Sequence, residues 1–409
     1  MKAPADLLIV NAGQLLTLAG PNEWPRTGKA LRELGLVADG ALAAADGVVV
    51  AAGPAGQVLD EITLVPGGAR VDAAGAVVLP GFVDPHTHLV FDGSRAGEFT
   101  QRLGGATYQE IARRGGGIVA TMRATREASE ERLVALGRAR LDRMLAHGTT
   151  TAEAKSGYGL TVEDELKLLR AIHRLTAAHD VDVIPTFLGA HAVPPEHAGD
   201  PDAYVRLVIE EMIPAIVEED LAEFCDVFCE GGAFTPEQSR AVLTAGADAG
   251  LEPKIHADEL SDLGGAQLAS EVGAVSADHL LYASDEGLSA MAATGTMAVL
   301  LPGTALFLGL PYARARRMIE LGVAVALATD FNPGTSPTYS MPMAVALGCI
   351  GMHLDPAEAI VAATINAAHA IGAAEEVGSL EPGKAADAVI LEMTDYRELP
   401  MAFGTNPVR

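Results

Sequence analysis

The middle of the chain alternates short apolar runs with longer segments of helical period. The runs occupy residues 82–85, 149–154, 183–188, 225–229, 254–257, 275–278, 297–301 and 323–329. Helix signals lie between them: Thr235, for example, is followed by Pro236 and Gln238, which together offer an N-cap, a first-turn proline and a capping box. After the eighth run the pattern stays helical from 341 to 371. Eight strands joined by helices predict an α/β fold of the (β/α)8, TIM-like barrel type.

The two ends of the chain have the pattern of a small β domain. Short apolar runs separated by Gly, Asn, Asp and Pro fill the first part, at 7–10, 15–18, 48–52 and 77–79. Near the other end, residues 378–391 return to a turn followed by a strand. This pattern predicts a β-sandwich built from both ends. The expected domains are residues 1–79 and 376–409 for the small β domain and 80–375 for the barrel.

One uncharged stretch, residues 287–313, is long enough to span a bilayer. Its internal glycines and prolines would break a lipid-exposed helix. We therefore expect a helix end, a buried strand and a loop there, all within the protein core.

Composition narrows the functions open to this fold. With 409 residues, 49% of them hydrophobic, the chain buries a large core and is not disordered. It has 54 Asp and Glu residues against 28 Lys and Arg residues, a net charge of -26. Such a field repels phosphate backbones and anionic lipid, so neither nucleic acid nor a membrane is expected as a partner.

Cysteine usage points to a reducing compartment. Cys225, Cys229 and Cys349 are too few and too unevenly placed for a disulfide framework. The first 18 residues lack the apolar core of a secretory signal peptide. A cytoplasmic location is expected.

Two histidines two residues apart follow the first apolar run. His86 and His88 point the same way if the chain is extended there. Both can then face the C-terminal mouth of the barrel, where barrel enzymes keep their active sites. Neutral imidazole is a common ligand for zinc and iron. The alternative is a pair of solvated loop histidines.

The ends of other runs carry further polar residues. His256 lies at the exit of the fifth run and Glu259 in the loop after it, His279 comes directly after the sixth run, and Asp330 follows the eighth. Three histidines and one aspartate at the exits of strands one, five and eight predict a mononuclear metal site with a position left for water. The role of His191, which follows the third run, stays open: the residue either contacts the substrate or holds the loop.

These motifs resemble the amidohydrolase superfamily, whose metal-dependent members combine such a barrel with a small β domain from both chain ends. The resemblance covers nearly the whole chain. Five motifs limit the resemblance to one branch of the superfamily. They are PHTHLVF at 85–91 followed by Arg95, KSGYGL at 155–160, FLGAH at 187–191, HADE at 256–259 and TDFNPGT at 329–335. Together they resemble the branch that opens the ring of 4-imidazolone-5-propanoate with water, giving N-formimidoyl-L-glutamate in histidine degradation.

The resemblance implies the residues of the site. The implied ligands of one zinc or iron ion per subunit are His86, His88, His256 and Asp330. The implied substrate contacts are Arg95, Tyr158, His191, Glu259, Asn332, Gly334 and Thr335. Simpler roles stay open: Arg95 as a surface residue paired with Glu98, Tyr158 as packing, and residues 332–335 as turn chemistry.

The implied reaction uses three catalytic groups. A divalent metal brings the pKa of a bound water toward about 7, which supplies a nucleophile at neutral pH. Asp330 is expected to take the proton of the water, Glu259 to deliver one to the leaving nitrogen, and His279 to polarise the carbonyl. The propanoate tail needs a cation, and Arg95 offers a bidentate one.

Rival functions stay open at this point. A single metal is favoured, because the two-metal branch of the superfamily carries a carboxylated lysine on the fourth strand and residues 225–230 contain none. A deaminase of purine or pyrimidine rings would use the same ligands, but a neutral ring needs no cation such as Arg95. A non-catalytic binding barrel is opposed by the intact ligand set. Large apolar barrels often pair, so we expect a homodimer.

Overall fold

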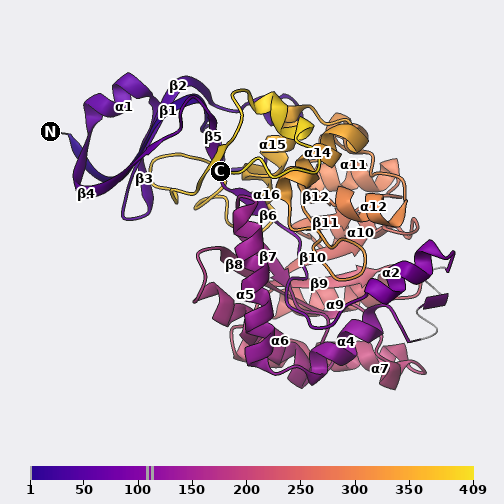
Figure 1. Ribbon diagram of the computed structural model, residues 1–409. Helices are drawn as coiled ribbons and strands as arrows, with labels where there is room; N and C mark the ends of the chain where they lie inside the picture. The colour runs from indigo at the N-terminus through magenta and orange to yellow at the C-terminus, as the bar shows by residue number, and fades with distance from the viewer. Residues whose placement is uncertain (1, 107–109, 112–114) are drawn as a thin grey trace.

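The computed structural model describes residues 2–106, 110–111 and 115–409, and the predicted barrel forms most of it (Figure 1). Eight strands hydrogen-bond to one another in chain order. They are β6 (Phe82–Asp84), β7 (Thr149–Lys155), β8 (Asp182–Ala190), β9 (Phe224–Cys229), β10 (Glu252–Ala257), β11 (Ser276–His279), β12 (Met297–Leu300) and β13 (Val325–Leu327). Every paired neighbour is parallel. The predicted α/β fold and (β/α)8 barrel are confirmed.

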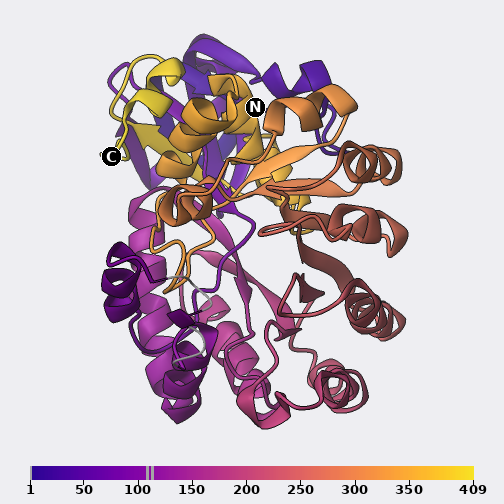
Figure 2. The same ribbon diagram turned by 90° about the vertical axis from the view of Figure 1, so that its right-hand side faces the viewer.

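Helices cover the outer face of the strands, as Figure 2 shows along one side. The described helices from α2 onward are α2 (Ala96–Leu103), α4 (Ile118–Glu127), α5 (Glu130–Ala146), α6 (Val162–Thr176), α7 (Pro201–Leu207), α8 (Ile213–Glu218), α9 (Pro236–Asp248), α10 (Gly265–Glu271), α11 (Asp285–Thr294), α12 (Pro302–Leu308), α13 (Ala315–Leu321), α14 (Met341–Met352), α15 (Pro356–Ala362) and α16 (Ile365–His369). The predicted capping box starts α9, because Thr235 and Gln238 bond to each other's backbone.

The small β domain is one sheet built from both chain ends. Its elements are β1 (Ala3–Leu16), β2 (Leu36–Ala45), β3 (Val48–Pro54), α1 (Ala55–Glu61), β4 (Ile62–Asp72), β5 (Val77–Pro80) and β14 (Ala388–Leu391). The strand order is β14-β5-β1-β2-β3, with β4 on β1. Ile390 of the C-terminal strand lies opposite Val78. The joint contribution of the two ends is therefore confirmed, while the numerical domain limits stay a prediction.

The barrel closes between its first and last strands just beyond their ends. Thr87 and Phe331 form a parallel bridge. Asp330 N donates to His86 O at 3.0 Å, and His88 N donates to Phe331 O at 2.9 Å. The side chains of His86, His88 and Asp330 therefore project from a seam whose backbone is fixed.

The last strand is shorter than the run that predicted it. It ends at Leu327, whereas the apolar run continues to Thr329. Thr329 donates through N and Oγ1 to the carboxylate of Asp84 at 3.0 and 2.5 Å. At Thr329 the backbone N–H is therefore bonded to the Asp84 side chain and not to the backbone of a neighbouring strand.

The uncharged stretch 287–313 lies within the fold. It forms most of α11 and the buried strand β12, as predicted, but residues 302–308, predicted as a loop, form the helix α12 with Pro302 in its first turn. In the described parts of the chain no helix has the length and apolar character to cross a membrane.

Candidate active site

A cavity of about 460 Å³ opens where the barrel strands end. The predicted site residues that line it are His88, Arg95, Tyr158, His191, His256, Glu259, His279, Asp330, Asn332 and Thr335. His86 belongs to the floor but is fully buried, and Gly334 lines a neighbouring cavity. Residues far apart in the sequence therefore converge on one concave site, at the end of the barrel where such enzymes keep their chemistry.

Three imidazoles and one carboxylate meet at the floor of this cavity. His86 Nε2 and His88 Nε2 each lie 3.6 Å from Asp330 Oδ1. His256 Nε2 lies 3.5 Å from His88 Nε2. Ligand atoms placed about 2.1 Å from one tetrahedral ion are about 3.4 Å from each other. The three distances, His86 to Asp330, His88 to Asp330 and His256 to His88, are therefore those expected between ligands of one metal ion.

The chemistry of the donors also fits a metal. His86 Nε2 is buried and has no hydrogen-bond partner among the residues that the structure describes. Leaving such an atom unpaired is costly, and a cation would satisfy it. Burial, together with the Lys155 ammonium, keeps the pKa of His86 well below its usual value, and burial has the same effect on His88. Both rings are therefore neutral, which is the form that binds zinc and iron.

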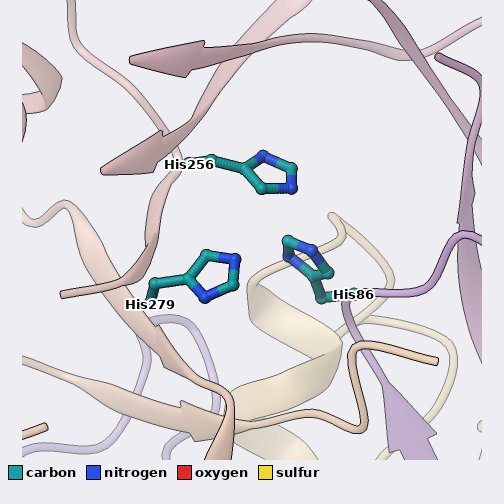
Figure 3. A group of neighbouring side chains, drawn as sticks. All are labelled: His86, His256 and His279. Atoms are coloured by element: carbon teal, nitrogen blue, oxygen red, sulfur yellow. The ribbon is translucent and has the colours of Figure 1, made fainter. Parts of the chain in front are cut away.

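His279 lies beside the predicted ligands. Figure 3 shows its ring facing those of His86 and His256, and one ring nitrogen of each lies within 4.8 Å of the others. The backbone at His279 and at Asp330 is left-handed, with φ of 75° and 52°. Such strain persists in non-glycine residues where the surrounding structure imposes it, often at active sites. His279 is thus a neighbour of both the ligand cluster and the cavity.

Glu259 faces the same cavity, with Oε1 3.7 Å from His279 Nδ1. Burial, reinforced by the carboxylates of Asp330 and Glu230, raises the pKa of Glu259 to about 8. The side chain therefore carries a proton at neutral pH, as a general acid must. Glu230 also fixes the Glu259 loop, because its carboxylate accepts a hydrogen bond from Leu260 N at 2.8 Å.

Arg95 lines the cavity and is also paired with Glu98. It is only 8% exposed, and its Nε donates to Glu98 Oε2 at 2.9 Å. Gly334 packs directly against the guanidinium, since a Cβ there would lie 2.2 Å from Nη1. Arg102, which sequence reasoning missed, also lines the cavity. Its spacing of seven from Arg95 places both on one face of a helix, a signal that was available.

Tyr158 and His191 form part of the cavity wall. The His191 ring stacks on His88, with centroids 5.0 Å apart and planes at 18°. His191 Nδ1 lies 3.0 Å from Gly157 O, so this nitrogen is used in the loop. Burial, together with His256, lowers the pKa of His191 to about 3 and keeps it neutral. His191 therefore serves the loop and faces the cavity at once.

The Asn332 side chain is occupied by its own loop. Its Oδ1 accepts from Gly334 N at 2.8 Å and from Thr335 N at 2.7 Å. Its Nδ2 donates to Asp330 O and to Thr335 Oγ1, both at 2.8 Å. The turn chemistry that the sequence left open is therefore present, and it places Asp330 and Thr335 at the cavity.

A set of buried charges beneath the floor is absent from the sequence-based site. Its members are Glu153, Lys155, Asp226, Lys254 and Asp278, each with no exposed surface. They lie on β7, β9, β10 and β11. The sequence did carry a signal for some of these charges. Glu153 and Lys155 are two residues apart with an apolar residue between them, and so are Lys254 and His256. On a strand, the two members of each pair point to the same face.

Comparison with known proteins identifies the class to which this barrel and site belong. A family model described as "Amidohydrolase family" matches residues 77–408. The chain belongs to this family.

Curated relatives narrow the class further. An imidazolonepropionase of Symbiobacterium thermophilum is 56% identical over 407 residues, which cover 99% of this chain and 95% of the relative. An imidazolonepropionase of Geobacillus kaustophilus is 56% identical over 401 residues, covering 98% and 95%. Within the amidohydrolases, the chain groups with the imidazolonepropionases.

Solved structures share the fold at much lower identity. An adenosine deaminase from Xanthomonas campestris with bound zinc superposes with a TM-score of 0.74 at 19% identity, over 100% of this chain and 91% of that one. The guanine deaminase of E. coli gives a TM-score of 0.71 at 17% identity, over 94% and 88%. The architecture is thus common to hydrolases of different ring substrates.

Proposed function

We propose that this protein is a metal-dependent hydrolase that opens the ring of 4-imidazolone-5-propanoate with water, giving N-formimidoyl-L-glutamate in histidine degradation. The observation that carries the proposal is the group of His86, His88 and Asp330, with His256 Nε2 3.5 Å from His88 Nε2, next to a cavity that Arg95 also lines. The identity with imidazolonepropionases over nearly the whole chain supports the choice of substrate.

The four floor residues would hold one divalent ion, zinc or iron. When bound, such an ion makes water nucleophilic at neutral pH and polarises a carbonyl. Asp330 would take the proton of the attacking water on a carboxylate oxygen. Thr304 supports this carboxylate, because its Oγ1 donates to Asp330 Oδ2 at 2.5 Å.

Glu259 would act on the leaving nitrogen and His279 on the ring carbonyl. Attack on the ring carbonyl is followed by breakage of its bond to the ring nitrogen, which must gain a proton to leave. Glu259 would supply that proton, since the pKa of its buried carboxyl is raised to about 8. His279 would polarise the carbonyl or hold the developing oxyanion.

Arg95 would bind the propanoate tail through a charge-assisted hydrogen-bonded pair. Its guanidinium is held by Glu98 and given room by Gly334. Tyr158, His191, Asn332 and Thr335 would complete the pocket around the ring. We also propose a homodimer working in the cytoplasm, an assignment supported by the large apolar barrel and by three free cysteines.

Mass spectrometry of the metal-loaded protein mixed with freshly generated imidazolone propanoate tests the function. We expect a product heavier than the substrate by one water, formed faster than in buffer and lost in His256→Ala. Ammonia is assayed in the same samples, because a ring deaminase would release it. No hydrated product from protein shown to hold its metal would contradict the proposal, and ammonia release would favour the deaminase.

A further inference from the structure

Two buried carboxylates orient two of the histidines at the cavity floor. His86 Nδ1 lies 2.5 Å from Asp278 Oδ2, and His256 Nδ1 lies 3.0 Å from Asp226 Oδ2. A ring whose Nδ1–H donates to a carboxylate keeps its lone pair on Nε2. The carboxylates therefore fix both the orientation of each ring and the tautomer that can bind a metal.

A single ammonium group joins these two carboxylates. Lys155 Nζ lies 2.8 Å from Asp226 Oδ2 and 3.8 Å from Asp278 Oδ2, and the side chain has no exposed surface. Glu153 Oε2 lies 2.8 Å from the same nitrogen. Although burial alone would lower the pKa of Lys155, these carboxylates raise it well above its usual value, so the cation persists.

We propose that Lys155 is a positioning residue for the metal centre: its ammonium bridges Asp226 and Asp278 and so holds the acceptors for the Nδ1–H groups of His256 and His86. This inference rests on the proposed function, because it takes the cavity floor to hold a metal ion. Without the bridge, the two like-charged groups repel each other in a dry interior and turn away from the imidazoles. Both rings then lose the partner that fixes their tautomer.

Lys254 provides a matched control in the same network. It is as deeply buried as Lys155, and its Nζ lies 2.8 Å from Glu153 Oε1. Its Nζ also lies 3.3 and 3.2 Å from the carbonyl oxygens of Pro85 and Ala370, and 5.2 Å from the centre of the Phe224 ring. In the part of the chain that the structure describes, it forms no ion pair with a carboxylate that contacts a histidine. Removing Lys254 takes away a buried charge but leaves Lys155 in contact with Asp226 and Asp278.

The test compares Lys155→Met with Lys254→Met in the full-length protein. Zinc affinity is measured by competition with a chromogenic chelator, and the tautomers of His86 and His256 are read from nitrogen-15 NMR of the zinc-loaded proteins. We expect Lys155→Met to bind zinc about 10- to 100-fold more weakly, as is typical when a partner behind a metal ligand is lost. Its slowly exchanging Nδ1–H signals should shift or disappear. Lys254→Met should keep both properties of the unaltered protein.

Equal zinc affinity in the two variants, with both histidine signals unchanged, would overturn this proposal. An unaltered protein that binds no zinc would instead overturn the proposed function. If Lys155→Met fails to fold, the double variant Lys155→Met with Glu153→Gln keeps the net charge of the network. It is compared with Lys254→Met with Glu153→Gln, and the same difference in zinc affinity is expected.

Discussion

The part of the barrel interior below the cavity differs from the apolar clusters of the small β domain. Beneath the cavity, the barrel buries a set of paired lysines and carboxylates that includes Lys155 and Asp278. The two core clusters of the small β domain, around Leu8 and Leu42, are made of apolar side chains. Removing a charge from water costs several kcal/mol per ion, even when the ion is paired. The buried charges of the barrel therefore cost stability, whereas the two apolar clusters contribute it.

If the barrel interior carries the chemistry, Glu259→Gln should have a large effect on turnover. The amide cannot donate a proton to the leaving nitrogen, so we expect kcat to fall by about 100- to 10,000-fold while metal content is unchanged. Steady-state kinetics and metal analysis of the same preparation measure the two effects. A kcat within threefold of the unaltered enzyme would remove Glu259 from the mechanism.

The pH profile sharpens this assignment. The pKa of Glu259 is raised to about 8, mainly by burial, and the residue must be protonated to act as an acid. In the unaltered enzyme kcat/KM should therefore be high below this value and fall as the pH rises through about 8. The falling limb should be absent from the residual activity of Glu259→Gln. A limb that persists in the variant would assign it to another group.

Loss of Arg95 should affect substrate binding more than turnover. A hydrogen bond to a charged group contributes about 1.5–3 kcal/mol, so Arg95→Met is expected to raise KM by about 10- to 100-fold. Arg102→Met is the matched control, because Arg102 lines the same cavity but donates to Phe307 O. If Arg102→Met raised KM more than Arg95→Met, the propanoate tail would be assigned to Arg102.

The smallest effect on activity is expected from the small β domain. Leu42 has no exposed surface and lies in the apolar cluster formed with Leu15 and Val78. Leu42→Ala should lower the free energy of unfolding by about 2–5 kcal/mol. Thermal unfolding should show this loss, and kcat at a temperature where the variant stays folded should be unchanged. A parallel loss of kcat would mean that this domain also shapes the site.

The sequence predicted the strands of the barrel and the cluster at its floor for the same physical reason. Strand exits are marked by polar residues next to apolar runs: His86 and Asp330 come after the ends of β6 and β13, and His256 is the second-last residue of β10. Because parallel strands end at the same rim, their exits converge without any knowledge of the loops.

The charges beneath the floor could not be predicted in the same way. Asp226 lies within an apolar strand, and its partner Lys155 comes from a strand some 70 residues earlier, so sequence shows neither its burial nor its pairing. The cavity wall depends on loop conformation, which hydrophobic periodicity does not encode. Only the structure shows that Arg102 reaches the cavity and that the Asn332 side chain bonds within its own turn.

The most direct test of the central claim is anomalous diffraction from crystals of the zinc-loaded protein. We expect one zinc ion per chain, bonded at about 2.1 Å to Nε2 of each floor histidine and to the Asp330 carboxylate. The floor histidines are His86, His88 and His256. An ion held by His279 in place of His88, or no ion at the floor, would contradict it.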